Sequence, residues 1–187
     1  MTSVKGMSSR ALQAEHTRQQ ILQTAQRLFV ERGYDATSLQ LIADEMGLTK
    51  AAVYYHFRVK SELLHATMKP GIERINAVAD EAAALRGRRA RIEHVVSGVA
   101  DFLVENRHYA VMAATDPAAK RHDMDKESSD LRERILTLFY GDNPTATQRL
   151  AYAAVAGIPD SLPELVELSD DELREALRET MLRILRV

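Results

Sequence analysis

Apolar side chains recur at every third or fourth position along most of the chain, which is the spacing of helices that bury one face. The first such segment stops at Gly33, a residue type that commonly ends helices. No segment shows the apolar and polar alternation of a half-buried strand. The pattern therefore predicts an all-α protein whose first helix covers residues 15–32. The apolar positions of this helix are Ile21, Leu22, Ala25, Leu28 and Phe29.

A short second helix is predicted to begin at Thr37. Gln40 follows three residues later and completes a capping-box pattern, in which two side chains satisfy backbone N–H groups at the start of a helix. Gly47 ends the helix. Its expected buried stripe consists of Leu39, Ile42, Ala43 and Met46.

Two further helices follow closely. Thr49 is the N-cap candidate of a third helix over residues 50–57. Lys60 and Ser61 open a fourth helix, which is predicted to continue past Pro70 with a kink, because proline removes a backbone donor. The positions expected to face inward in these two helices are Val53, Phe57, Leu63, Leu64, Thr67 and Met68.

The rest of the chain keeps the helical pattern. Ser169 and Glu172 repeat the capping-box pattern, and Asn143 before Pro144 also indicates a helix start. The five helices predicted here cover residues 92–105, 107–114, 126–140, 145–156 and 172–185. The predicted connections are the polar residues 115–125 and the proline-containing residues 157–168.

Composition narrows the range of functions. The chain has 187 residues and no cysteine, which excludes disulfides, thiolate metal sites and cysteine nucleophiles. No apolar run is long enough for a membrane span, and the polar N-terminus lacks a signal-peptide core, so we expect a cytoplasmic protein. Residues 1–67 hold 8 basic and 6 acidic side chains, and residues 68–187 hold 17 and 21. A basic first part suits a polyanionic partner, although a solvated face shows the same small surplus.

The second and third helices carry the candidate chemistry. Two short helices joined through Gly47 and Leu48 have the size and turn chemistry of a helix-turn-helix. A recognition helix enters the major groove by its N-terminal end, which therefore needs small, polar or basic side chains. Thr49 can contact a phosphate, Lys50 a guanine or a phosphate, and Ala51 a thymine methyl. The periodicity alone fits a small helical hairpin packed on a core equally well.

The stretch from Thr17 to Leu64 resembles the DNA-binding domain of the TetR family of transcriptional regulators. The run Val53 to Phe57, which reads Val-Tyr-Tyr-His-Phe and is followed by Lys60, is more specific than a generic helix-turn-helix. The other residues that carry the resemblance are Ile21, Ala25, Phe29, Gly33, Tyr34, Ala36, Thr37, Ser38, Ile42, Ala43, Gly47, Leu48, Thr49, Lys50, Ala51, Ala52 and Leu63.

The resemblance implies which residues contact double-stranded DNA. Ser38 and Gln40 match positions that contact phosphate and base edges. Lys50 makes the start of the third helix more basic than the small polar residue often found there, so no base preference carries over. The groove-facing positions are matched by Thr49, Lys50, Ala51 and Tyr55, and the phosphate-contacting positions by Tyr54, His56 and Lys60.

The resemblance also implies the architecture and the mode of action. We expect a flexible N-terminal arm at residues 1–14, a helix-turn-helix domain at 15–60, and an effector-binding and dimerisation domain at 61–187. A small apolar ligand, bound among the middle helices, would release a repressor from its operator. Met and aromatic positions at helical spacing fit plain core packing as well. The candidates for the ligand cavity are Met68, Ile72, Ile75, Phe102, Tyr109, Met112, Leu138 and Phe139.

A homodimer is implied through the last two long helices, residues 145–156 and 172–185. Two-fold symmetry presents two recognition helices to major grooves about 34–36 Å apart or a small multiple of that distance, so the operator should be a palindrome. The apolar and small positions expected in this contact are Leu150, Ala151, Ala153, Ala154, Ala156, Leu173, Leu177, Met181, Leu182 and Leu185.

Other functions have weaker support. The six histidines form no close i, i+4 pair, and Asp116, Asp123 and Asp125 lack the glycine and glutamate of an EF-hand loop. The four arginines within residues 86–91 fit a solvated turn or a second polyanion contact. A helical adaptor and a small helical enzyme are the competing interpretations. Because no nucleophile, carboxylate pair or metal ligands converge, the sequence predicts no enzyme, no cofactor and no metal site.

Overall fold

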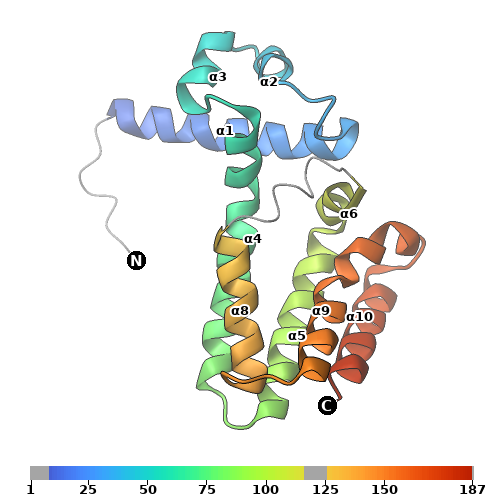
Figure 1. The fold of residues 1–187 in the computed structure, drawn as a ribbon. Coiled ribbons are helices and arrows are strands. Elements are labelled where there is room, and N and C mark those ends of the chain that lie inside the picture. Colours follow the sequence, from blue (N-terminus) through green and yellow to red (C-terminus); the bar gives the residue numbers. More distant parts are fainter. Residues whose placement is uncertain (1–8, 116–125, 187) are drawn as a thin grey trace. The chain divides into compact units, whose positions relative to one another are not determined.

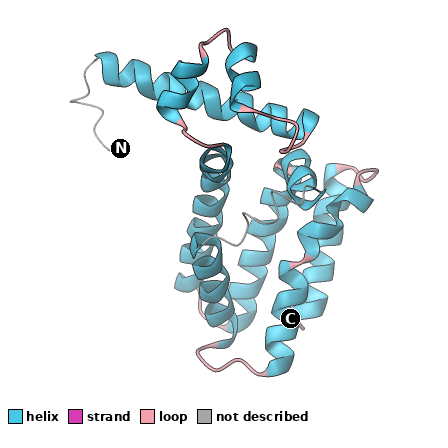
Figure 2. Ribbon diagram, turned by 45° about the horizontal axis from the view of Figure 1, so that its top comes forward, coloured by secondary structure: helices cyan, strands magenta, loops and turns pink. Residues whose placement is uncertain are grey.

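The computed structural model describes residues 9–115 and 126–186, and every regular element in these ranges is a helix (Figure 1, Figure 2). The all-α prediction is confirmed. Most of the predicted connection, residues 116–125 with its three aspartates, and the first eight residues of the expected arm lie outside the described residues. The contacts divide the chain into two compact units, Met1–Met68 (unit 1) and Lys69–Val187 (unit 2). No helix within the described ranges combines the length and apolar composition that crossing a bilayer requires.

The first helix of unit 1 is longer than predicted. It begins at Ser9 rather than at Glu15, because residues 11–14 are mostly good helix formers that carry no apolar stripe for the periodicity to detect. It ends before Gly33, as predicted, where φ is 83°. The helices of unit 1 are α1 (Ser9–Arg32), α2 (Leu39–Glu45), α3 (Lys50–His56) and the start of α4 (Lys60–Ala84).

The N-cap of α2 is Ser38 and not the predicted Thr37. The Ser38 hydroxyl accepts a hydrogen bond from the backbone N–H of Leu41 at 3.0 Å. Thr37 is fully buried, and its hydroxyl lies 2.8 Å from the carbonyl oxygen of Gly33 and 3.2 Å from that of Leu28. The predicted capping box is therefore wrong, because the hydroxyl that it needs closes the turn after α1.

Helix α3 begins as predicted, since Thr49 Oγ1 accepts a hydrogen bond from the backbone N–H of Ala52 at 3.2 Å. Helix α2 packs against both α1 and α3. Leu22, Met46 and Met68 are only half-buried, although they belong to the predicted apolar stripes. The core of unit 1 consists of Ile21, Ala25, Leu28, Phe29, Tyr34, Leu39, Ile42, Ala43, Val53, Phe57, Leu63 and Leu64.

Unit 2 contains the rest of α4, which passes through Pro70 as predicted. Thr145, and not Asn143, caps α9, because its hydroxyl accepts a hydrogen bond from the backbone N–H of Gln148. The predicted connection over residues 157–168 contains a short 3₁₀ helix, η1. The further elements of unit 2 are α5 (Arg88–Glu105), α6 (Arg107–Thr115), α8 (Lys126–Tyr140), α9 (Ala146–Ala156), η1 (Ile158–Leu165) and α10 (Asp170–Leu185).

The capping box predicted at the start of α10 is confirmed. The Ser169 hydroxyl accepts a hydrogen bond from the backbone N–H of Glu172, and the Glu172 carboxylate accepts one from the backbone N–H of Ser169 at 2.9 Å. The Ser169 hydroxyl also donates to the Glu172 carboxylate at 2.6 Å, and this bond, together with the one from the Ser169 backbone N–H, lowers the pKa of Glu172. The first turn also carries Asp170 and Asp171, whose negative charges interact favourably with the positive end of the helix dipole.

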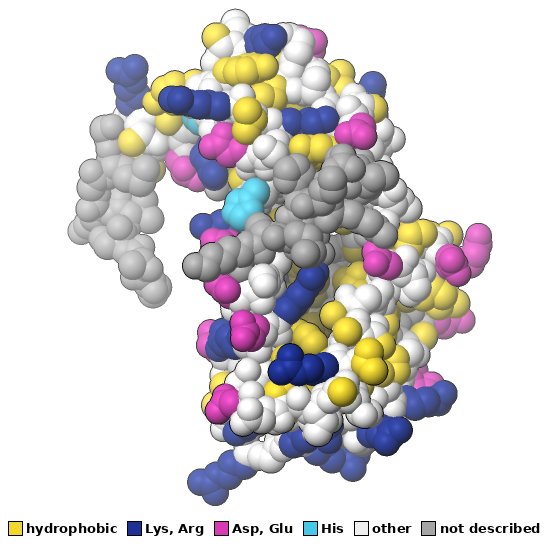
Figure 3. Space-filling view, in the orientation of Figure 1, with side chains coloured by type: hydrophobic (Ala, Val, Ile, Leu, Met, Phe, Trp, Pro, Cys, Tyr) yellow, Lys and Arg dark blue, Asp and Glu magenta, His cyan; other side chains and the backbone are white. Residues whose placement is uncertain are grey.

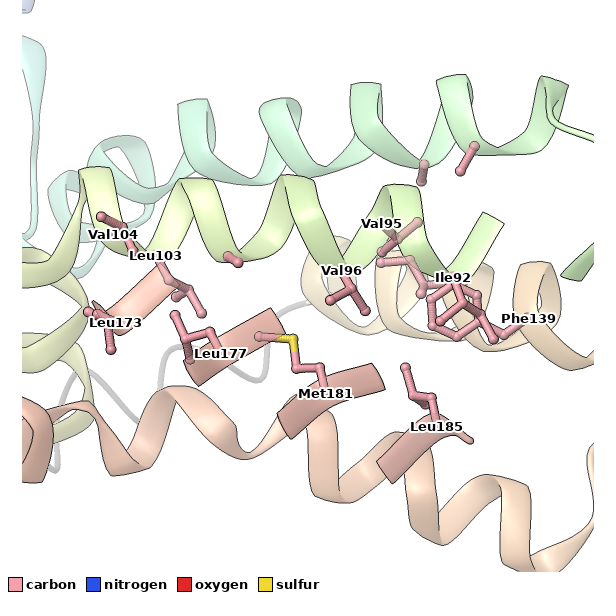
Figure 4. Close-up of a cluster of buried hydrophobic side chains, with 14 of the residues drawn as sticks. Ile92, Val95, Val96, Leu103, Val104, Phe139, Leu173, Leu177, Met181 and Leu185 are labelled. Atoms are coloured by element: carbon pink, nitrogen blue, oxygen red, sulfur yellow. The ribbon is translucent and has the colours of Figure 1, made fainter. Parts of the chain in front are cut away.

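Helix α5 contacts α10, α8 and α6, and its apolar side chains form much of the core of unit 2. Figure 4 shows them facing the side chains of α10. Leu173, Leu177, Met181 and Leu185 are only 1–2% exposed on this side of α10. The prediction that these four residues form the dimer contact is therefore wrong. The apolar stripe of α10 is already covered by α5 within one protomer.

Helices α4 and α5 approach closely where each carries a glycine. A Cβ atom at Gly98 would lie 2.7 Å from both Cγ atoms of Val78, and one at Gly71 would lie 2.7 Å from Cζ of Phe102. Carbon atoms in favourable contact are about 3.5–4.0 Å apart. Neither position therefore has room for a side chain unless its neighbour moves.

Three of the four arginines around the α4–α5 turn have partners within the fold: Arg89 pairs with Glu93 at 2.8 Å, and two others bind carbonyl oxygens. Arg88 donates from Nη2 to the carbonyl oxygen of Leu185 at 2.8 Å, and its guanidinium lies 4.8 Å from the centroid of the Tyr140 ring. Arg91 donates from Nε to the carbonyl oxygen of Leu85 at 3.0 Å. Figure 3 shows Lys and Arg side chains gathered at this end of unit 2. Arg88 and Arg91 thus satisfy carbonyl groups at helix ends.

Candidate DNA-binding surface

Helix α3 turns one face to the core of unit 1 and the other to solvent. Val53 is fully buried and Phe57, the C-cap, is 2% exposed. A recognition helix needs this arrangement, because its inner face must hold it to a scaffold while its outer face enters the groove. The predicted groove-facing side chains are all exposed: Thr49, Lys50, Ala51 and Tyr55.

The outer face of α3 combines aromatic and basic side chains. Tyr55 is 80% exposed and Tyr54 is 41% exposed. Lys50 Nζ lies 5.3 Å from the centroid of the Tyr54 ring, and half-buried His56 meets Tyr55 edge to face with their ring centroids 5.1 Å apart. Figure 3 shows hydrophobic and Lys or Arg side chains mixed on the surface over α3. Exposed aromatic rings beside a lysine are typical of a contact surface.

Ser38 and Gln40 lie at the start of α2, and both are exposed. The Ser38 oxygen accepts the capping hydrogen bond, so its O–H group can still donate to a phosphate. Gln40 donates from Nε2 to Asp44 at 2.7 Å, which holds its amide along α2. Exposed polar groups therefore lie at the start of α2 as they do at the start of α3, and both sets can bind the same kind of partner.

Lys60 is placed differently from the other predicted DNA contacts. It is half-buried, and its Nζ donates to the carbonyl oxygens of Tyr34 at 2.7 Å and Asp35 at 3.3 Å. The same Nζ lies 4.1 Å from the centroid of the Tyr34 ring. Its contact with a phosphate stays a prediction, whereas its contacts with the turn after α1 are part of the fold.

Two arginines of α1 contact the C-cap of α3 and a residue of α2, and neither arginine was among the residues predicted from the sequence. The Arg18 guanidinium lies 5.0 Å from the centroid of the Phe57 ring. Arg27 pairs with Glu45 of α2 at 2.5 Å and with Glu31 at 3.0 Å, and the hydrogen bonds to Glu45 and Glu31 raise the pKa of the guanidinium. Only the Arg27 to Glu31 pair has a sequence signal, the i, i+4 spacing.

The eight residues predicted to bind the effector lie in different surroundings. Phe139 belongs to the core of unit 2, and Met112 is also buried. Ile72 lines a cleft between α4 and α8. The half-buried candidates are Met68, Ile75, Phe102, Tyr109 and Leu138.

The cleft between α4 and α8 has a volume of about 350 Å³, which lies within the range of small-molecule sites. Arg134, one of the lining residues, is held in place by its neighbours on α4: it donates a hydrogen bond to Asn76 Oδ1 at 3.1 Å and pairs with Asp80. Ile72 and Leu131 supply the apolar side chains of a lining that is otherwise polar or charged. The lining residues are Lys69, Ile72, Glu73, Asn76, Glu127, Asp130, Leu131 and Arg134.

Helix α9 has an apolar outer face. Leu150 is 71% exposed, and Ala153 and Ala154 beside it are exposed too. Val166, just after η1, is 53% exposed. Figure 3 shows hydrophobic side chains at the surface over this part of unit 2. A large exposed apolar side chain among small ones is typical of a protein contact.

A comparison of the sequence with known protein families finds a match within unit 1. Residues 21–67 match the family model of bacterial regulatory proteins, tetR family. The chain is 32% identical over 90 residues to the transposon Tn10 TetC protein of Escherichia coli, covering 48% of this chain and 46% of that protein. It is 43% identical over 56 residues to the HTH-type transcriptional regulator TtgR of Pseudomonas putida, covering 30% and 27%. The chain thus spans less than half the length of these two curated relatives.

Solved structures share the fold over most of the chain. PfmR, a TetR family transcriptional regulator from Thermus thermophilus, has a TM-score of 0.67 at 22% identity and covers 97% of both chains. A TetR/AcrR family regulator from Thermobifida fusca has a TM-score of 0.61 at 27% identity, covering 89% of this chain and 97% of that one. The chain therefore carries the DNA-binding domain of the TetR family of transcriptional regulators and shares the fold of solved members of that family.

Proposed function

We propose that the protein is a dimeric repressor that binds a palindromic operator and is released from it by a small ligand. The observation that carries this proposal is the outer face of α3, where Lys50, Ala51 and Tyr55 are exposed while Val53 is buried. A helix in this setting can enter the major groove by its N-terminal end. Exposed Leu150 on α9 supports the dimer, because two copies of that face can cover each other across a two-fold axis.

The exposed residues of α2 and α3 have separate roles in this proposal. Ser38 and Gln40 fix the start of α2 on the phosphate backbone, and Tyr54 and His56 do the same at α3. The base edges are read from the start of α3, where Ala51 is small enough to meet a thymine methyl. The groove-facing residues are Thr49, Lys50, Ala51 and Tyr55.

The operator is tested by selecting bound duplexes from a random pool of double-stranded DNA at near-physiological salt, followed by sequencing. We expect a two-fold palindrome, because a symmetric dimer presents identical recognition helices to two half-sites. Asymmetric enriched sites would argue against the dimer. The protein is unfolded and refolded before the selection, which removes any ligand carried over from expression. If this protein enriched no motif, the proposal of sequence-specific binding would be overturned.

Replacing Lys50 by alanine is expected to weaken operator binding by about 1–3 kcal/mol per half-site, which is the usual cost of losing one base contact. Fluorescence anisotropy at several salt concentrations measures the effect. Loss of a phosphate contact from both protomers lowers the salt slope by about 1.8, whereas loss of a base contact relaxes the selected motif at one position in each half-site. The control is Arg178→Ala, which removes a positive charge from an exposed position of unit 2. Unchanged affinity of the Lys50 variant would contradict its role.

The effector is proposed to bind in unit 2 with its apolar part against Ile72 and Leu131 in the cleft between α4 and α8. A screen of small apolar and amphiphilic compounds by thermal shift should find ligands that raise the melting temperature and also weaken operator binding. Leu131→Trp narrows the cleft and should abolish both effects, whereas Leu12→Trp, on the exposed side of α1, should abolish neither. Ligands that act equally on Leu131→Trp would place the effector elsewhere.

A further inference from the structure

The Lys60 ammonium group is almost fully engaged inside unit 1. An ammonium has three N–H donors. Two of them meet the carbonyl oxygens of Tyr34 and Asp35, at 2.7 Å and 3.3 Å, and the cation lies 4.1 Å from the centroid of the Tyr34 ring. A ring face at that distance attracts a cation. These contacts leave one N–H donor, so Lys60 can form only one hydrogen bond to a phosphate without losing a contact to the turn.

The turn that Lys60 contacts is also fixed from the side of α1. Tyr34 is 5% exposed, and its ring packs on Phe29 with the centroids 5.4 Å apart. The backbone N–H of Thr37 donates to the Tyr34 carbonyl at 3.1 Å, so this oxygen accepts from both Thr37 and Lys60. The buried Thr37 hydroxyl holds the same turn to the end of α1 through the Gly33 carbonyl at 2.8 Å.

This turn leads directly into the DNA-binding surface. Ser38 follows Thr37 and is the exposed N-cap of α2, with its oxygen bound to the backbone N–H of Leu41. The position of the Ser38 hydroxyl therefore depends on the conformation of the turn. Lys60, the first residue of α4, ties this turn to a helix other than α1.

We propose that Lys60 is a positioning residue for DNA binding and does not contact phosphate itself. It holds the Tyr34–Thr37 turn so that Ser38 and the start of α2 are already in place when the operator arrives. This inference rests on the proposed function, because it assigns Lys60 a role in the same DNA-binding surface. Without Lys60 the turn would have to be ordered at the moment of binding, which weakens affinity.

Three possible roles of Lys60 give different measurements. A phosphate contact that is removed from both protomers of the dimer lowers the salt slope of binding by about 1.8, because two fewer counterions are released. A merely structural residue changes the melting temperature but not the affinity of protein that is fully folded. A positioning residue lowers the affinity of fully folded protein at an unchanged salt slope, and its effect overlaps with that of the residue it positions.

The experiment uses the full chain and the operator duplex obtained by selection. Lys60→Met keeps an unbranched apolar stem of similar length but removes the charge and all three donors. Ser38→Ala and the double variant complete a mutant cycle, and Arg178→Met is the control, because it removes the charge of an exposed side chain on α10. Dissociation constants are measured by anisotropy over a range of KCl concentrations, at a temperature where circular dichroism melts show every variant to be folded.

We expect Lys60→Met to weaken binding about tenfold with the wild-type salt slope, and Ser38→Ala to add little in the Lys60→Met background. Arg178→Met should bind like the wild type. A salt slope lowered by about 1.8, or unchanged affinity of folded Lys60→Met, or additive effects of the two substitutions would overturn the positioning role. Wild-type protein that binds no duplex would instead overturn the proposed function, and the positioning role with it.

Discussion

Replacing Leu177 by alanine is expected to lower the free energy of unfolding by about 2–5 kcal/mol, the usual cost of removing a buried leucine side chain. Leu177 is 2% exposed in the core of unit 2, and Figure 4 shows it on the face of α10 that meets α5. The cost includes the cavity left between these helices as well as the lost burial of the methyl groups. Chemical denaturation followed by circular dichroism at several protein concentrations measures it.

The matched control for this substitution is Leu150→Ala. Leu150 also lies on a helix of unit 2 but is 71% exposed, so its own protomer should lose within about 0.5 kcal/mol. A destabilisation by Leu177→Ala that fell steeply with rising protein concentration would indicate that Leu177 contacts a second copy. The structure places Leu177 in the core of one protomer. The loss of unfolding free energy should therefore not depend on protein concentration as long as the state of association stays the same.

Replacing Leu150 by arginine is expected to dissociate the proposed dimer and weaken operator binding by about 100-fold. Symmetry removes two leucines from the contact at once, each worth about 1.5–3 kcal/mol when fully buried, and about 1.4 kcal/mol corresponds to a factor of ten. The introduced arginines would also face each other near the two-fold axis as like charges. Sedimentation velocity gives the state of association, and anisotropy gives the affinity for the operator.

The matched control for the dimer is Leu12→Arg, which adds the same charge at a leucine that is 45% exposed on α1. It should leave the association state unchanged. Thermal melts must show that the Leu150 variant is folded, which its exposure leads us to expect. A Leu150→Arg protein that still sediments as a dimer would place the contact on another face, for which Val166, 53% exposed after η1, is the next residue to replace.

The helices and the candidate recognition face were predictable because both depend on local patterns. The inward positions Val53 and Phe57 follow from helical spacing, and Thr49 caps α3 as its residue type predicts. The capping box of Ser169 and Glu172 was equally visible, because its two partners are three residues apart. Local rules suffice where both partners of an interaction belong to one helix end.

Contacts between distant segments were not predictable from the same patterns. Thr37 and Ser38 are both good N-cap residues, and the choice between them is made by the carbonyl groups at the end of α1 that bind the Thr37 hydroxyl. Lys60 has the sequence context of a phosphate contact, yet the carbonyl of Tyr34, 26 positions earlier in the chain, binds its ammonium. The apolar stripe of α10 likewise indicates that this helix packs against another surface, but only the tertiary structure identifies that surface as α5.

The glycines that let α4 and α5 touch also restrict how unit 2 can change shape. Val78 occupies the space beside Gly98, and Phe102 occupies the space beside Gly71, so each helix is indented where the other protrudes. Sliding or rolling one helix over the other would drive these side chains into backbone, and close-packed interiors transmit such strain rather than absorb it. The unit 2 part of α4 and α5 should therefore behave as a single rigid body. A rearrangement driven by an effector would have to run through the helices packed around this pair.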